Sequence, residues 1–204
     1  MGPGRAAEVI REGMFRGADN GYLLTDRAFA GADTLATSYA LATAIRKIGE
    51  YDIIIGGRQA IDGDTAQVGP QIAEKLHLPQ VSYVEEVVEA AADHVVVKRQ
   101  FEDGYHIIKI KTPCLLTAIA ELATPRYMSV RGIVEAYEKE IKVLGFEDLK
   151  DGLELDMIGL KGSPTNVYQS FTKEVKGAGT ILEGLSADEA VKAIMDKLEA
   201  KFII

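Results

Sequence analysis

The sequence predicts an α/β protein with a mostly parallel sheet, to which antiparallel strands are added on one side. Strand and helix patterns alternate over the first 88 residues, which is typical of successive βαβ units. Residues 51–56 contain three consecutive isoleucines followed by glycine. A continuous β-branched run of this kind indicates a strand buried on both faces, as in a parallel sheet.

The elements of this first part follow in a regular order. Apolar residues at helical spacing predict helices over residues 4–15 and 33–47, and a third helix that begins at Asp64-Thr65 and ends near Leu76. Strands are expected over residues 22–25, 51–56 and 81–88. Residues 26–31 and 58–63 are expected to be loops.

The pattern changes after residue 88. Residues 95–97 and 106–110 are β-branched runs on either side of Asp103-Gly104, and Asp-Gly is a hairpin turn signal. Residues 114–119 predict one more strand. The parallel sheet is therefore expected to carry an added antiparallel hairpin.

The last part of the chain differs in composition, so we expect two regions, an α/β domain over residues 1–144 and a second region over residues 145–204. Residues 145–175 are polar and interrupted by Gly and Pro, which indicates an extended arm. Ser186 and Glu189 form a capping box that starts an amphipathic helix. The apolar stripe of this helix fits docking on another protein or packing on its own domain.

Composition excludes several classes of function. The net charge of −8 argues against a nucleic-acid-binding protein, and the apolar runs are too short for insertion into a membrane. The single cysteine, Cys114, lies in an apolar run and is expected to be a buried core thiol. One cysteine cannot form an internal disulfide, so a cytoplasmic location is expected.

Two segments begin alike and carry the strongest local signal for a ligand. Residues 31–34 read Gly-Ala-Asp-Thr and residues 62–65 read Asp-Gly-Asp-Thr, each after a predicted strand. Helix N-termini beyond the carboxyl ends of neighbouring strands present free N–H groups and suit phosphate. Asp and Thr are also ordinary N-cap residues, so a purely structural interpretation stays open.

Other chemistries find no support in the sequence. Residues 62–64 suggest calcium, but Ala73 occupies the position where an EF-hand loop needs an acidic residue. The sequence has no Walker A or GxGxxG motif, no His/Cys set with metal spacing and no convincing pair of nucleophile and base. This pattern is typical of a protein that holds a cofactor.

A longer motif gives more specific information than the two short segments. Residues 57–70, Gly-Arg-Gln-Ala-Ile-Asp-Gly-Asp-Thr-Ala-Gln-Val-Gly-Pro, closely resemble the nucleotide-binding signature of electron-transfer flavoprotein β subunits. Residues 25–34, 122–127 and 162–165 resemble the same family. These matches are ordered and spread over most of the chain.

The resemblance implies an adenine-nucleotide-hydrolase-like (Rossmann-like) fold and an α-subunit partner in a heterodimer. It also implies electron exchange with a flavin dehydrogenase, such as an acyl-CoA dehydrogenase. Most aerobic family members hold a structural AMP, whereas electron-bifurcating members hold a second FAD that NADH reduces. The motif is more similar to the bifurcating group, so FAD is expected and AMP is the alternative. A free-standing nucleotide-binding protein of the same fold is a third interpretation.

The resemblance also implies a set of site residues. The expected cofactor-binding residues are Asp33, Thr34, Thr37, Arg58, Gln59, Ala60, Asp62, Gly63, Asp64, Thr65, Gln67, Val68, Gly69 and Pro70. Asp33 and Asp64 are assigned to loop shaping and hydroxyl contacts, because a carboxylate beside a pyrophosphate is unfavourable. Arg58 is expected to face phosphate or the flavin ring, with a surface ion pair as the alternative.

A second set is implied for docking of the redox partner, namely Leu122, Pro125, Arg126 and Tyr127. Leu122 is expected to be an exposed anchor, with a leucine folded onto its own core as the alternative. By the same resemblance, family members carry two further strands ahead of the point that matches Met1. The sequence is therefore expected to be a fragment or to start at an internal methionine.

Overall fold

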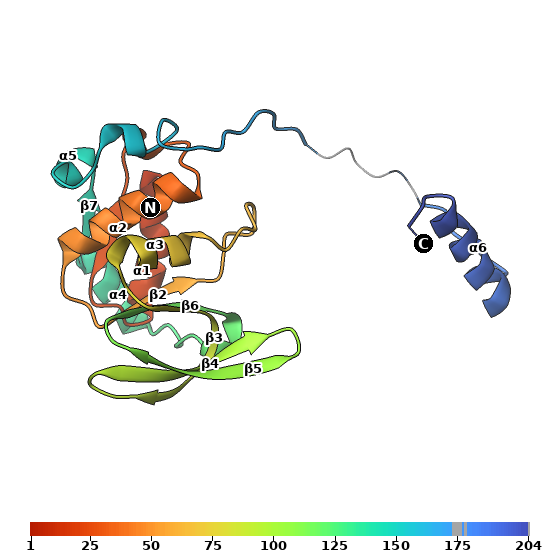
Figure 1. Ribbon diagram of the computed structural model, residues 1–204, viewed down its shortest axis with the longest axis horizontal. Coiled ribbons are helices and arrows are strands. Elements are labelled where there is room, and N and C mark those ends of the chain that lie inside the picture. Colours follow the sequence, from red (N-terminus) through yellow and green to blue (C-terminus); the bar gives the residue numbers. More distant parts are fainter. Residues whose placement is uncertain (173–176, 178, 204) are drawn as a thin grey trace. The chain divides into compact units, whose positions relative to one another are not determined.

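The computed structural model in Figure 1 describes residues 1–172, 177 and 179–203. The chain divides into two compact units, Met1–Asn166 and Val167–Ile204. The expected α/β class is confirmed, since parallel strands, an antiparallel extension and covering helices all occur in the first unit.

The larger sheet has the strand order β2-β6-β3-β4-β5, so β2 lies at its edge. The prediction that the isoleucine run is buried on both faces is wrong, because Ile53 and Ile55 of β2 are 37% and 59% exposed. The strands of this sheet are β2 (Ile53–Gly57), β3 (Gln80–Ala90), β4 (His94–Phe101), β5 (Gly104–Lys111) and β6 (Cys114–Ala118). β6 pairs in parallel with both β2 and β3, whereas β3, β4 and β5 pair antiparallel, as the Asp103-Gly104 turn predicts. Cys114 is buried, as expected, and burial raises the pKa of its thiol.

A second, two-stranded sheet pairs β1 (Gly21–Leu24) in parallel with β7 (Ile141–Leu144). Neither β7 nor the preceding helix α4 (Val130–Glu138) is predicted from the sequence. Since β1 and β2 lie in different sheets, the prediction that the two Asp-Thr segments follow neighbouring strands is wrong.

Helices cover these sheets. The helices of the first unit are η1 (Gly4–Ala6), α1 (Ala7–Phe15), η2 (Arg27–Phe29), α2 (Thr34–Ile48), α3 (Val68–Leu76), η3 (Ala120–Leu122), α4, α5 (Phe146–Leu149) and η4 (Leu155–Met157). The second unit contains α6 (Ala187–Glu199) and is described separately below. α2 begins at its cap Asp33 and ends at Gly49, whose φ of 79° favours glycine. None of the described helices has the length and apolar character needed to cross a membrane.

Three apolar clusters form the core. One joins Leu24 of β1 to α2, a second consists of side chains from β3, β4, β5 and β6, and a third packs α3 against Leu115 of β6. α2 reaches this third cluster through Leu41 and Ile45. The contact between α2, α3 and the sheet fixes the loop that joins β2 to α3.

Residues 145–166 pack with the first unit and do not form the start of an extended arm. Leu149, Leu153 and Ile158 are buried in the cluster around Leu24 and Phe29. Of the expected arm, residues 173–175 lie outside the described part of the chain.

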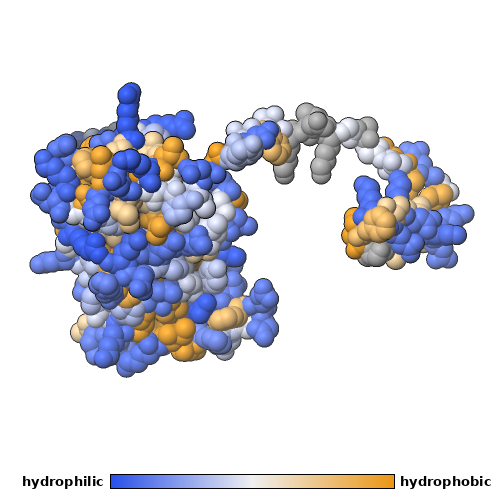
Figure 2. Space-filling model, turned by 45° about the horizontal axis from the view of Figure 1, so that its top comes forward, coloured by the Kyte–Doolittle hydropathy of each residue, from blue (hydrophilic) through white to orange (hydrophobic). Residues whose placement is uncertain are grey.

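The second unit contains the predicted amphipathic helix. Ser186 and Glu189 form the expected capping box, because Glu189 accepts a hydrogen bond from the Ser186 N–H at 2.9 Å and donates its own N–H to the Ser186 hydroxyl. Val191, Ile194 and Met195 leave apolar surface exposed on α6 (Figure 2).

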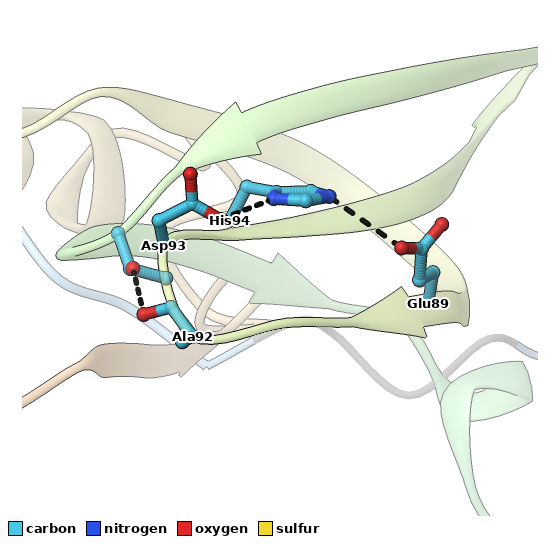
Figure 3. A network of polar contacts seen from close by, with 5 residues as sticks. Glu89, Ala92, Asp93 and His94 are labelled. Atoms are coloured by element: carbon cyan, nitrogen blue, oxygen red, sulfur yellow. Dashed lines mark hydrogen bonds and ion pairs between the residues drawn. The ribbon is translucent and has the colours of Figure 1, made fainter.

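A polar cluster holds the turn between β3 and β4 (Figure 3). His94 lies between two carboxylates, with Nδ1 2.7 Å from Asp93 and Nε2 3.6 Å from Glu89. The hydrogen bond to His94 lowers the pKa of Asp93. The cluster belongs to the exposed hairpin and is separate from the site described next.

Candidate functional site

A cavity of about 520 Å³ opens at the carboxyl end of β2. The loop between β2 and α3 forms one wall. The opposite wall is apolar and consists of Leu41 and Ile45 of α2, Ile54 of β2, Ile72 of α3 and Leu115 of β6. This volume and this mixture of an apolar wall with a few polar groups are typical of small-ligand sites.

Glycines keep the loop side of the cavity open. A Cβ atom at Gly56, Gly57 or Gly63 would meet no heavy atom within 4 Å. Gly69 differs, because a Cβ there would lie 2.5 Å from Cγ2 of Thr117. Gly69 is therefore needed for close packing of α3 on β6, whereas the other three glycines leave room for a ligand to approach the backbone.

The loop has a strained backbone just before α3. Asp64 and Ala66 adopt positive φ angles of 51° and 52°, which cost energy for residues other than glycine. The Asp64 N–H donates to the Ala60 carbonyl at 3.0 Å, and the Asp64 carboxylate accepts a hydrogen bond from Gln59. Asp64 thus shapes the loop, in agreement with its expected role.

The prediction that a helix begins at Asp64-Thr65 is wrong. α3 begins at Val68, with Gln67 as its N-cap, and Thr65 lies between the two residues with positive φ. The positive φ angles prevent the helix from extending back to Asp64. The free N–H groups of the first turn therefore belong to Val68 and Gly69, which both line the cavity.

The other Asp-Thr segment does start a helix. Oδ1 of Asp33 accepts hydrogen bonds from the N–H groups of Leu35 and Ala36 at 2.9 and 3.0 Å. Thr34 donates its hydroxyl to Oε1 of Gln67 at 3.0 Å, which ties the start of α2 to the start of α3. Thr34 of the first segment and Thr65 of the second segment line the same cavity.

Asp33 also holds residues that lie far away in the chain. Its N–H donates to the Ser163 hydroxyl at 2.8 Å, and its Oδ2 accepts from Thr165. Partial burial raises the pKa of Asp33, but the hydrogen bonds from Ala36, Thr165 and Leu35 outweigh it and hold the pKa below its ordinary value. The carboxylate of Asp33 is thus occupied by hydrogen bonds within the protein, and these bonds hold the start of α2 against residues 163–165.

The structure brings most of the predicted cofactor-binding residues to one cavity. The predicted residues that line it are Thr34, Arg58, Gln59, Ala60, Gly63, Asp64, Thr65, Gln67, Val68 and Gly69. Asp33, Thr37, Asp62 and Pro70 do not line it. The sequence interpretation missed the apolar wall, although the helical spacing of Leu41, Ile45 and Ile72 could have indicated which faces of α2 and α3 point inward.

Arg58 projects from the loop toward a neighbouring aromatic side chain. Its guanidinium carbon lies 4.9 Å from the centre of the Tyr83 ring. Arg58 forms no ion pair with any carboxylate in the part of the chain that the structure describes, so the surface ion pair is not observed. Within the same residues, no group of three His, Cys, Asp or Glu side chains could hold a metal ion.

The predicted docking segment is divided between core and surface. Leu122 is partly buried and packs against the cluster formed by β3, β4, β5 and β6, as in the core alternative. Tyr127 is 98% exposed, and Arg126 lies beside Gly17. The exposed apolar residue of this segment is therefore Tyr127.

Together, fold and cavity define an α/β protein with a cavity at the carboxyl end of a parallel strand, the place where open α/β sheets bind ligands. Residues 1–149 match the family described as the electron transfer flavoprotein domain. The chain belongs to the electron transfer flavoprotein family.

Relatives match over the whole chain. This chain is 53% identical to an electron transfer flavoprotein subunit beta of Thermoanaerobacterium thermosaccharolyticum. It is 49% identical to the caffeyl-CoA reductase-Etf complex subunit CarD of Acetobacterium woodii. Each of these two alignments covers 100% of this chain and 77% of the relative. It is also 52% identical to an acryloyl-CoA reductase electron transfer subunit gamma of Anaerotignum propionicum, over 100% of this chain and 78% of the relative.

Proposed function

We propose that the chain is the β subunit of a heterodimeric electron-transfer flavoprotein and that the cavity beside β2 holds the adenine-nucleotide part of FAD. The observation that carries this proposal is the cavity itself, in which a glycine-rich loop faces an apolar wall at the carboxyl end of a strand. The subunit passes electrons between NADH or a dehydrogenase and flavin acceptors.

The residues present fit an adenine nucleotide. An apolar wall that includes Leu41, Ile45 and Ile72 suits a planar base. The N–H groups of Val68 and Gly69 at the start of α3, together with the Thr65 hydroxyl, suit phosphate oxygens. Arg58 supplies a positive charge at the rim.

Two acidic residues near the cavity, Asp64 of the loop and Asp33 at the cap of α2, are compatible with this binding. The carboxylate of Asp64 accepts a hydrogen bond from Gln59, and both oxygens of Asp33 accept hydrogen bonds from protein groups. Donor N–H and O–H groups at these oxygens stabilise the carboxylate charges and partly offset their repulsion of a phosphate. When bound, FAD supplies the electron-accepting flavin ring, while the chain binds and orients the nucleotide.

A heterodimer is proposed because relatives are named as subunits of electron-transfer complexes. The exposed apolar side chains of α6 support the same proposal, since a polar rim around such a patch marks protein interaction sites. The α subunit of an electron-transfer flavoprotein is the proposed partner, and an acyl-CoA dehydrogenase or another flavin dehydrogenase is the proposed redox partner.

A cofactor count tests the proposal. The chain is co-purified with its α subunit, the complex is denatured, and the released nucleotides are separated and quantified. Two FAD per heterodimer support FAD in this cavity and electron bifurcation driven by NADH. One FAD and one AMP support the structural alternative, in which the β subunit serves a carrier for acyl-CoA dehydrogenases. A single FAD with no second nucleotide contradicts both.

A further inference from the structure

A segment near the end of the first unit packs closely on the loop that leads into α2. A Cβ atom at Gly159 would lie 2.2 Å from the carbonyl oxygen of Ala28, and Gly159 has a φ of 55°. The Leu160 N–H donates to the carbonyl of Ala30 at 3.0 Å, and a Cβ atom at Gly31 would lie 3.3 Å from Cβ of Leu160. Glycine on both sides therefore brings the two backbones into contact.

Ser163 joins these two segments through a buried hydroxyl. The residue is 7% exposed. Its hydroxyl accepts a hydrogen bond from the Asp33 N–H at 2.8 Å and donates to the carbonyl of Gly159 at 2.6 Å, with the Gly31 carbonyl at 3.4 Å. Because buried polar groups need partners, removal of the hydroxyl would leave the Asp33 N–H without its acceptor.

Thr165 holds the same aspartate by its side chain. Oδ2 of Asp33 accepts hydrogen bonds from the N–H and the hydroxyl of Thr165. Oδ1 alone caps α2, by accepting from Leu35 and Ala36. The contacts with Ser163 and Thr165 are therefore not needed for capping. They fix the backbone and the carboxylate of Asp33 relative to residues 159–165.

The series of contacts continues to the cavity. Thr34 follows Asp33 and donates its hydroxyl to Oε1 of Gln67 at 3.0 Å. Gln67 is the N-cap of α3, whose first N–H groups are those of Val68 and Gly69. Thr34 and Gln67 both line the cavity. A shift of Asp33 would therefore move Thr34 and loosen its hold on the start of α3.

We propose that Ser163 and Thr165 are positioning residues of the nucleotide cavity, which they do not line themselves. They hold Asp33, and through Asp33 they hold Thr34 against Gln67. This inference rests on the proposed function, in which the N–H groups at the start of α3 bind phosphate. Donors that are fixed in advance lose little conformational freedom when a ligand binds. Loss of either contact should therefore speed release of the nucleotide.

The test measures nucleotide release from the purified heterodimer. The loaded complex is diluted into buffer with charcoal, and the adenine nucleotide that stays bound is quantified over time. The Gly63→Val complex gives the background from nucleotide bound elsewhere. Ser163→Ala should speed release from the cavity about tenfold, the scale of one hydrogen bond, and Thr165→Val should speed it several-fold.

Thr43→Val is the matched control. Thr43 is a buried hydroxyl on the same helix, and it donates to the carbonyls of Tyr39 at 3.1 Å and Gly152 at 3.4 Å. It does not line the cavity. Thr43→Val should lower the thermal midpoint of the complex and release nucleotide at the rate of the wild type. A general loss of stability is thereby separated from a loss of positioning.

A double-mutant cycle tests the route of the effect. Thr34→Val removes the hydroxyl that binds Gln67. If Ser163 acts through this bond, Ser163→Ala should speed release much less in the Thr34→Val background than in the wild type. Independent effects would multiply the rate by the same factor in both backgrounds.

Three results overturn the proposal. They are wild-type release from both Ser163→Ala and Thr165→Val, equal acceleration in Thr43→Val, and an unchanged effect of Ser163→Ala in the Thr34→Val background. If Ser163→Ala does not fold, Thr165→Val takes its place in the test and in the cycle, since Thr165 is exposed. A full nucleotide content in Gly63→Val contradicts the proposed function and this inference with it. Wild-type release from the positioning variants, with Gly63→Val lacking one nucleotide, contradicts this inference alone.

Discussion

The carboxylate of Asp33 binds Thr165 twice. Its Oδ2 accepts hydrogen bonds from the Thr165 hydroxyl at 2.8 Å and from the Thr165 N–H at 3.2 Å. The same side chain caps α2 through Oδ1. Asp33 thus links the start of α2 to Thr165, near the end of the first compact unit. The start of α2 lies at the edge of the proposed cofactor cavity.

Removing the Thr165 hydroxyl should weaken this contact. Thr165→Val keeps the shape of the side chain and loses one hydrogen bond to a charged acceptor, so the free energy of unfolding should fall by about 1–2 kcal/mol. Urea unfolding measures this change. The exposed Thr180 lies in the second unit, and Thr180→Val should leave the unfolding midpoint of the first unit unchanged. Equal midpoints for Thr165→Val and the wild type contradict the contact.

Asp33 should also make stability depend on pH. Its pKa in the folded protein is lower than the ordinary 3.8, so its contribution to stability is fully present above pH 3.8 and is lost as the pH falls through the folded pKa. Asp33→Asn removes the titrating group. The variant should be less stable than the wild type at neutral pH, and this difference should shrink as the pH falls below 3.8. A difference that stays constant over this range excludes Asp33 as the source.

The strained loop predicts a stabilising substitution. Ala66 has a φ of 52°, a conformation that costs about 1–2 kcal/mol for a residue with a Cβ atom. Ala66→Gly should therefore stabilise the protein by up to about 1 kcal/mol after the entropic cost of glycine is subtracted. Ala60 lies in the same loop without a positive φ, so Ala60→Gly should bring no gain. Thermal unfolding of both variants in the same buffer distinguishes strain at Ala66 from a general effect of added glycine.

The proposed docking segment gives a paired prediction. Leu122 packs on the core, so Leu122→Ala should lower the free energy of unfolding by roughly 1–2 kcal/mol, less than for a fully buried leucine. Tyr127 is exposed, so Tyr127→Ala should leave stability unchanged and slow electron transfer to the dehydrogenase if this segment docks the redox partner. Stopped-flow reduction of the partner measures the rate. A normal rate in Tyr127→Ala removes this segment from the docking surface.

The sequence predicted the parts of the fold that depend on local patterns. The isoleucine run of β2, the Asp103-Gly104 turn, the Asp33 cap and the Ser186 capping box all act through neighbouring residues, and each is found in the structure. The burial of the isoleucine run depends on the place of β2 in the sheet, and the prediction that it is buried on both faces is wrong because β2 is an edge strand. The start of α3 was misplaced because Asp64-Thr65 resembles a cap in sequence. Positive φ angles at Asp64 and Ala66 delay the helix to Val68, and nothing in the sequence specifies those angles.

Long-range pairings account for the remaining differences. β7 pairs with β1 from more than a hundred residues away, and residues 145–166 return to pack around Leu24. Polar composition made this last segment resemble an arm, although Leu149, Leu153 and Ile158 bury enough apolar surface to hold it. The loop side of the cavity was predicted from the sequence motif of residues 57–70. The apolar wall of the cavity was not predicted, because it depends on how α2 and α3 pack.

The central claim is that the loop before α3 holds an adenine nucleotide, and Gly63 tests it most directly. A Cβ atom at Gly63 would meet no protein atom within 4 Å, and Gly63 has no positive φ, so Gly63→Val should fold normally and occupy space beside the loop that the ligand needs. Gly179→Val, in the second unit and equally free of neighbours, is the matched control. Adenine nucleotide per heterodimer is counted after denaturation of each purified complex. Gly63→Val should lose one nucleotide equivalent per heterodimer and keep the thermal midpoint of the wild type. The Gly179→Val complex should keep the nucleotide content of the wild type. A full nucleotide content in Gly63→Val contradicts the claim that this loop holds the nucleotide.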